Sequence, residues 1–203
     1  ATKSSENYAQ LLSALCIKDA LESDDPYRIG AALHTFADTW SHQNFSGFHD
    51  DWNGGSGFSP LPDIGHAEVG EQPDLISERW TDRRLDMEIV NRDRAREALK
   101  AIFEWLSAYR DGGRHSWEEV AEEMEWLLRA RNQEERIERV KGLYPGENLD
   151  YDRKQWIEEA LEFDPESGEV VAKEAFLSSH WYRFQCAVQK QLARTLSLFP
   201  EGV

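Results

Sequence analysis

Four of the six histidines in this chain lie between residues 34 and 66, and several carboxylates lie among them. Three residues of this stretch, His34, Asp38 and His42, are spaced four apart. On a helix, each step of four residues turns by only about 40°, so the three side chains form one row. Imidazole nitrogens and carboxylate oxygens are donors that bind Zn²⁺ and similar ions. The spacing therefore indicates a site for a divalent metal on a helix.

The length of this row favours two ions over one. Neighbours in the row can share an ion because side chains four apart nearly touch. His34 and His42 lie about 12 Å apart along the helix axis, which is too far for both to bind the same ion. Asp38 has two oxygens and would bridge two ions, with His34 helping to hold one and His42 the other. His66, on the following loop, is the favoured further ligand. The alternatives on that loop are Asp50, Asp51 and His49.

The same spacing also has an explanation without metal. A His–Asp pair four residues apart on a helix is often a surface ion pair, or part of the hydrogen bonding of a core histidine. The gathering of four histidines beside carboxylates strengthens the case for metal binding, and by residue pattern alone both explanations stay open.

The row lies on a well-defined predicted helix. Asp25-Pro26 reads as a cap followed by proline in the first turn of a helix over residues 27–42. A loop over residues 44–77 follows, because nine glycines and prolines break any longer helix or strand there. A loop of roughly 30 residues is uncommon in a compact domain and is more often functional than idle.

The rest of the chain predicts further helices and no strand. Ser116 with Glu119 forms a capping box, Asn132 with Glu135 repeats that pattern, and Asn91 caps another helix. The predicted helices cover residues 7–21, 27–42, 92–110, 117–129, 133–142, 151–163 and 171–198. We therefore expect one compact all-α multi-helix domain over residues 1–203, with a metal-site half at 1–80 and a helical half at 81–203.

Charge and composition narrow the function. The net charge is −16, and residues 1–80 hold 13 acidic side chains against four basic ones. Nucleic-acid binding depends on Lys and Arg at phosphates, so no nucleic-acid partner is expected. The sequence has no apolar run of about 18 residues and no signal peptide, so a soluble, cytoplasmic protein is expected. The two cysteines, Cys16 and Cys186, are expected to be free, buried thiols.

The stretch Gly30-Ala31-Ala32-Leu33-His34-Thr35-Phe36-Ala37-Asp38-Thr39-Trp40-Ser41-His42-Gln43-Asn44-Phe45 resembles a helix of the zinc-dependent phospholipase C superfamily. That helix has the pattern ALH-x-x-x-D-x-x-x-H-x-N-F/W. The resemblance is closest to the Het-C-like branch and to an uncharacterised bacterial family with the same helix. It extends over roughly residues 8–106 and includes the segments Phe45-Ser46-Gly47, Gly65-His66-Ala67-Glu68 and Pro73-Asp74.

The resemblance implies an all-α fold with a zinc cluster, in which His34, Asp38 and His42 are ligands. It also implies hydrolysis of a phosphoester, such as a phospholipid head group or another small phosphodiester, by water that zinc or another divalent ion activates. Asp50 or Asp51 would then position this water or act as its base.

The chain departs from the superfamily pattern in three ways. Three residues separate Asp38 from His42, where the phospholipases and related nucleases have five, and their second H-x-x-x-E pair is missing. Residues 1–18 offer no histidine, although the superfamily draws ligands from an N-terminal helix. Either the chain is the C-terminal part of a longer protein, or its site is smaller. The rival hypothesis is a non-catalytic module that a metal stabilises, with a protein partner bound through the helices after Trp80.

Overall fold

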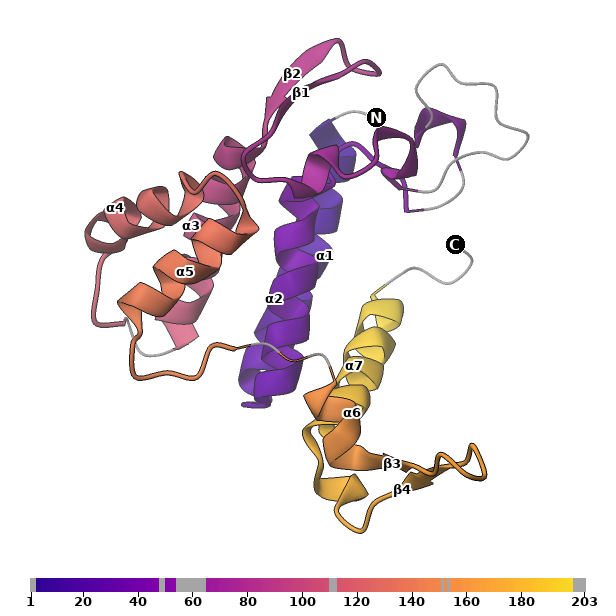
Figure 1. Cartoon of the computed structure of the whole chain (residues 1–203). Helices are drawn as coiled ribbons and strands as arrows, with labels where there is room; N and C mark the ends of the chain where they lie inside the picture. Colours follow the sequence, from indigo (N-terminus) through magenta and orange to yellow (C-terminus); the bar gives the residue numbers. More distant parts are fainter. Residues whose placement is uncertain are drawn as a thin grey trace. The chain divides into compact units, whose positions relative to one another are not determined.

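Helices dominate the part of the chain that the structure describes, which confirms the predicted fold class (Figure 1). The structure is a computed structural model, and it describes residues 3–47, 50–53, 65–109, 113–150, 152 and 154–198. The α-helices are α1 (Lys3–Glu22), α2 (Pro26–Ser41), α3 (Asn91–Tyr109), α4 (Trp117–Leu128), α5 (Gln133–Leu143), α6 (Gln155–Ala160) and α7 (His180–Ser197). The strands are β1 (Arg79–Asp82), β2 (Met87–Val90), β3 (Leu161–Phe163) and β4 (Val170–Ala172). The 3₁₀ turns are η1 (Asp51–Asn53), η2 (Ala67–Val69), η3 (Gln72–Asp74) and η4 (Phe176–Ser178). Among the described residues, none of these helices has the length and apolar content that crossing a membrane requires.

The chain divides into two compact units. The first combines Ala1–Leu11 with His34–Pro145, and the second combines Leu12–Leu33 with Gly146–Val203. The helices α1 and α2 therefore each contribute to both units. All the residues of the candidate site that the structure describes belong to the first unit.

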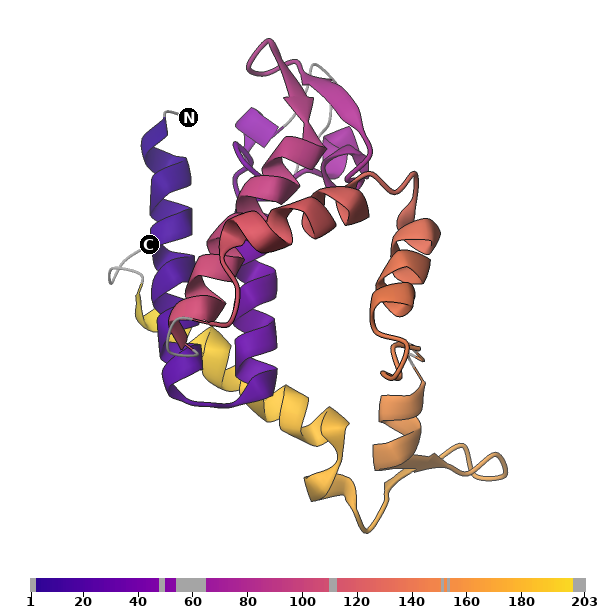
Figure 2. The same ribbon diagram turned by 90° about the vertical axis from the view of Figure 1, so that its left-hand side faces the viewer.

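In the first unit, α4 packs across α3 and against α5 (Figure 2). Its buried apolar side chains come from α2, the β1–β2 hairpin, α3 and the end of α4. Phe36 and Trp40 meet edge to face, with ring centroids 4.7 Å apart, and Trp80 and Ile89 are buried on paired positions of the hairpin. The apolar stripe of α2 thus faces this core, which leaves the opposite side of the helix for polar residues.

In the second unit, the connected ends of α1 and α2 form a helical hairpin, and α6 packs against α7. Arg28 on α2 donates a hydrogen bond to Asp19 on α1, and Arg194 on α7 lies 3.5 Å from the same carboxylate. Cys16 is buried and Cys186 is half-buried, and both are free thiols.

The starts of α2, α4 and α5 follow the predicted caps, and the start of α3 does not. The carboxylate of Asp25 accepts a hydrogen bond from the amide of Tyr27 at 3.0 Å. Ser116 and Glu119 form the reciprocal capping box at α4. Asn132 caps α5 by accepting from the amide of Glu135, but the carboxylate of Glu135 pairs with Arg131 instead of completing a box. Asn91 begins α3 without capping it, since its side chain bonds to other segments.

The expectation of a chain without strands is wrong in two places. β3 pairs with β4 around a turn that contains Pro165 and Gly168, so the predicted helices at 151–163 and 171–198 are shorter than expected. Proline and glycine break a helix locally, and the two short apolar runs beside them pair as strands. In β1, the inward positions are Trp80 and Asp82, and a buried aspartate hides the apolar–polar alternation that marks a strand.

Asp82 tolerates burial because Arg84 neutralises it. Asp82 is 1% exposed, and it accepts hydrogen bonds from Arg84 Nε at 2.9 Å and from Arg84 Nη2 at 2.7 Å. Burial by itself would raise the pKa of Asp82. The hydrogen bonds and the charge of Arg84, with a smaller contribution from Arg94, outweigh burial and hold this pKa below its usual range.

Replacing Asp82 with alanine should therefore destabilise the fold strongly. The change leaves the Arg84 guanidinium buried without its carboxylate, and the free energy of unfolding should fall by about 3–5 kcal/mol. The matched control is Glu88→Ala on the same hairpin, because Glu88 forms an exposed pair with Arg79. That change should cost about 0–1 kcal/mol. Urea denaturation of both variants measures the difference. Equal losses in the free energy of unfolding would show that the buried Asp82–Arg84 pair stabilises the fold no more than the exposed pair does.

The contribution of Asp82 should also depend on pH in a defined direction. Since its folded-state pKa lies below the ordinary value of 3.8, the stabilisation is present above that pH and is lost as the pH falls through the folded-state pKa. The difference in unfolding free energy between the wild type and Asp82→Asn should stay constant above about pH 5 and shrink below about pH 4. Denaturation curves at a series of pH values test this. A difference that grows in acid would contradict it.

Candidate metal centre

The predicted row of ligands on α2 divides into two groups. His34 Nε2 lies 3.7 Å from Asp38 Oδ2, one helical turn away, and 80% of the His34 side chain is exposed. His42 follows the last residue of α2, and its amide donates to the carbonyl of Asp38. Within the described part of the chain, the ion-pair partner of the Asp38 carboxylate is His34 and not His42. The ligand roles of His34 and Asp38 remain predictions.

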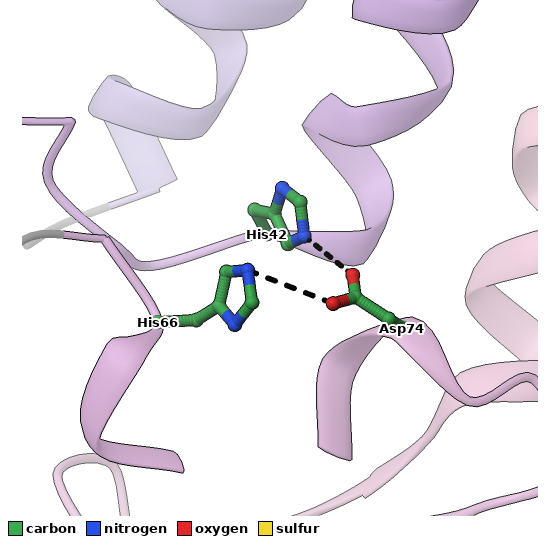
Figure 3. A group of neighbouring side chains, drawn as sticks. All are labelled: His42, His66 and Asp74. Carbon is green, nitrogen blue, oxygen red and sulfur yellow. Dashed lines mark hydrogen bonds and ion pairs between the residues drawn. The ribbon is translucent and has the colours of Figure 1, made fainter. Parts of the chain in front are cut away.

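His42 instead meets His66 and Asp74 (Figure 3). His42 Nε2 lies 2.8 Å from Asp74 Oδ1, and His66 Nε2 lies 3.7 Å from Asp74 Oδ2. One donor atom of each residue lies within 4.8 Å of the other two. The imidazole rings of His42 and His66 stack with their centroids 4.4 Å apart and their planes at 16°. The structure therefore brings together two of the predicted ligands and adds a carboxylate that was not predicted as one.

The hydrogen bonding of His66 indicates which of its nitrogens is available. His66 Nδ1 lies 2.9 Å from the carbonyl oxygen of Gly70. A carbonyl can only accept, so Nδ1 carries the hydrogen and a neutral ring has its lone pair on Nε2. That lone pair faces a carboxylate oxygen of Asp74, and two acceptors repel unless a proton or a cation lies between them. Metal-binding histidines commonly have this arrangement, with the second nitrogen bonded to a carbonyl.

The donor set is one that binds divalent ions. Ions bound at about 2.0–2.2 Å place neighbouring ligand atoms roughly 3–3.5 Å apart. His42 and His66 contact different oxygens of Asp74, at 2.8 and 3.7 Å, and one donor atom of each residue lies within 4.8 Å of the other two. Two imidazoles with one carboxylate form the ligand set of many catalytic zinc sites and of non-haem iron sites. Three protein ligands leave a coordination position for water or substrate.

Contacts with buried polar side chains hold the described residues that follow α2. Arg84 lies over the ring of Phe45 at 3.7 Å and donates to the carbonyl of Asn44 at 3.1 Å. The ring of Phe45 meets His66 edge to face, with centroids 6.1 Å apart. Asn53 is fully buried and bonds to both the amide and the carbonyl of Ser46. These contacts fix the end of the helix and one face of His66.

A cavity of about 650 Å³ lies beside the cluster and shares His42 with it. Its lining includes Asp38 from α2 and Asp50 from the following loop. Asp50 is exposed, and its Oδ1 accepts a hydrogen bond from the amide of Trp52 at 3.0 Å. Asp51 is also exposed and begins η1, and it does not belong to the described lining. His49 lies outside the residues that the structure describes.

Sequence reasoning did not single out Asp74 as a ligand. Asp74 lies 32 residues after His42, on a 3₁₀ turn of three residues, and no helical periodicity connects the two. The only signal was the Pro73-Asp74 pair within the resemblance. Proline at the first or second position of η3 fixes the backbone just before the aspartate.

Comparison with curated proteins and with solved structures gave no match. A protein-family model does match, and it covers residues 1–198, nearly the whole chain. The chain therefore belongs to the family described as "Family of unknown function (DUF6765)".

Proposed function

We propose that this chain is a metal-dependent hydrolase of phosphoesters, with His42, His66 and Asp74 as ligands of zinc or another divalent ion. The observation that carries the proposal is the convergence of three donor atoms within 4.8 Å, with His66 Nδ1 bonded to the carbonyl of Gly70 and Nε2 directed at Asp74. The neighbouring cavity supports it, because His42 belongs to both the cluster and the cavity wall.

The residues around the site have separate roles in this proposal. A divalent ion held there would supply a Lewis acid and lower the pKa of water beside it. Asp50, on the cavity wall, accepts the proton of the attacking water, and Asp38 is the other carboxylate on that wall. Phe45 and Trp52 also line the cavity and limit the access of bulk water.

The charge of the cavity lining determines what a phosphoester substrate would need there. The lining contains two carboxylates, Asp38 and Asp50, and no lysine or arginine among its described members. A bound ion must therefore supply the positive charge that stabilises a phosphoryl group. The resemblance to the zinc-dependent phospholipase C superfamily points to the same chemistry, with a phospholipid head group or another small phosphodiester as the substrate.

The second candidate is a non-catalytic helical module that a metal stabilises. The observation that favours it is the origin of the three donors, because His42, His66 and Asp74 come from separate parts of one long connection. An ion bound by all three residues would tie separate parts of this connection together, and the free energy of metal binding would then stabilise the folded state. The helices after Trp80 would then serve a protein partner. An open coordination position distinguishes the catalytic proposal from this one.

Metal binding should depend on the cluster. The purified chain should bind about one Zn²⁺ in isothermal titration. Asp74→Ala and His66→Ala should each weaken binding by more than about 100-fold, because each removes a direct ligand rather than an outer partner. His115→Ala is the matched control, since His115 pairs with Glu119 on the exposed surface of α4.

A further variant, His34→Ala, distinguishes the cluster from the predicted row on α2. Unchanged affinity would assign the ion to His42, His66 and Asp74. A loss as large as that of Asp74→Ala would return His34 to the ligand set. A wild-type chain that binds no divalent ion would overturn the proposed function.

Hydrolysis should depend on the metal and on Asp50. Bis(p-nitrophenyl) phosphate is a suitable probe, and its hydrolysis should stop with a chelator and return with Zn²⁺. Asp50→Asn should lower kcat by about 10²–10⁴-fold, as the loss of a general base does. Asp51→Asn is the control, because Asp51 is the adjacent exposed carboxylate outside the described cavity lining. Equal effects of the two variants would remove Asp50 from the mechanism, and a zinc-loaded chain without activity would favour the structural module.

A further inference from the structure

The turn that carries Asp74 has few hydrogen bonds of its own to fix its backbone. η3 contains three residues, and its N-cap residue Glu71 provides no side-chain hydrogen bond. Pro73 is buried, but 48% of the Asp74 side chain is exposed. A carboxylate on such a turn keeps its direction only if other segments fix the backbone on either side.

Asn91, the first residue of α3, fixes the backbone on both sides. Its Nδ2 donates to the carbonyl of Gln72 at 2.5 Å and to the carbonyl of Leu75 at 2.9 Å. These carbonyls lie two residues before Asp74 and one residue after it. The Asn91 side chain is 4% exposed, so the loss of either acceptor would leave a buried amide N–H without a partner, which is costly.

Trp80 sets the orientation of this amide. Trp80 Nε1 donates to Asn91 Oδ1 at 3.0 Å, and an indole nitrogen can only donate. The oxygen end of the amide must therefore face Trp80, which leaves the two N–H groups for Gln72 and Leu75. The amide oxygen of Asn91 thus accepts from a donor, and its two N–H groups donate to two carbonyl oxygens. Turning the amide over would lose all three hydrogen bonds.

We propose that Asn91 is a positioning residue for the metal centre: it holds the Asp74 carboxylate against His42 by binding the backbone on either side of Asp74. The inference rests on the proposed metal site, although Asn91 touches neither imidazole nor the ion position. Its action follows one path, from α3 through two carbonyls to the Asp74 turn.

Two measurements on Asn91→Ser test this inference. In the metal-free chain, the amides of Asp74 and Glu78 donate to Glu71 and Leu75 within the same segment, and their hydrogen exchange should accelerate at least tenfold. In titration, the Kd for Zn²⁺ should rise by about 10–100-fold, the range that outer partners of metal ligands show. The matched control is Gln191→Ser, which also removes a buried amide but lies on α7 in the second unit. It should change neither readout.

The outcomes distinguish this inference from the proposed function. Faster exchange with an unchanged Kd would overturn the positioning role, and so would unchanged exchange. A wild-type chain that binds no zinc would overturn the proposed function, and hydrogen exchange alone would then decide whether Asn91 fixes the Asp74 turn. If Asn91→Ser fails to fold, Trp80→Phe removes the indole N–H that orients the amide, together with part of a buried ring. It should shift both readouts in the same direction by a smaller factor.

Discussion

The connection between α2 and β1 has no regular hydrogen-bonding ladder in its described residues, so side chains join backbone amides in satisfying its carbonyl groups. Arg94 donates to Ser41, Arg84 and Trp52 donate to Asn44, and Asn91 donates to Gln72 and Leu75. The donors come mainly from the β1–β2 hairpin and from the first turn of α3. A buried carbonyl without a donor costs about as much as a lost hydrogen bond, so this constraint governs the whole region.

The constraint explains why polar residues occupy positions that would otherwise be apolar. Asp82 takes an inward position of β1 because it holds Arg84, and Arg84 reaches both Asn44 and the ring of Phe45. Asn91 is buried for a similar reason. A network of this kind stabilises only when every member is satisfied, because low local dielectric makes each unpaired group costly. The polar residues thus hold the described segments of the connection that they contact.

The candidate metal centre lies at the end of this network. His42 is positioned by the end of α2. His66 is positioned by its hydrogen bond to Gly70 and its contact with Phe45, and Asp74 is positioned by the backbone that Asn91 binds. The 2.8 Å contact between His42 and Asp74 can exist as a simple hydrogen bond, so the pair does not by itself require an ion. The contact of His66 with the second carboxylate oxygen needs a proton or a cation between the two atoms, and the proposed ion would fill that place.

The sequence by itself determined what local patterns encode. Pro26 and Asp25 started α2, the Ser116 box started α4, and the histidines with carboxylates marked the region of the candidate site. Only the tertiary structure decided that Asp74 joins His42 and His66, that Asn91 turns away from its own helix, and that Asp82 lies inside a strand. The physical reason is range. Helical periodicity and capping act within about four residues, whereas these contacts join residues that are distant in sequence or depend on a partner whose approach no local pattern reveals.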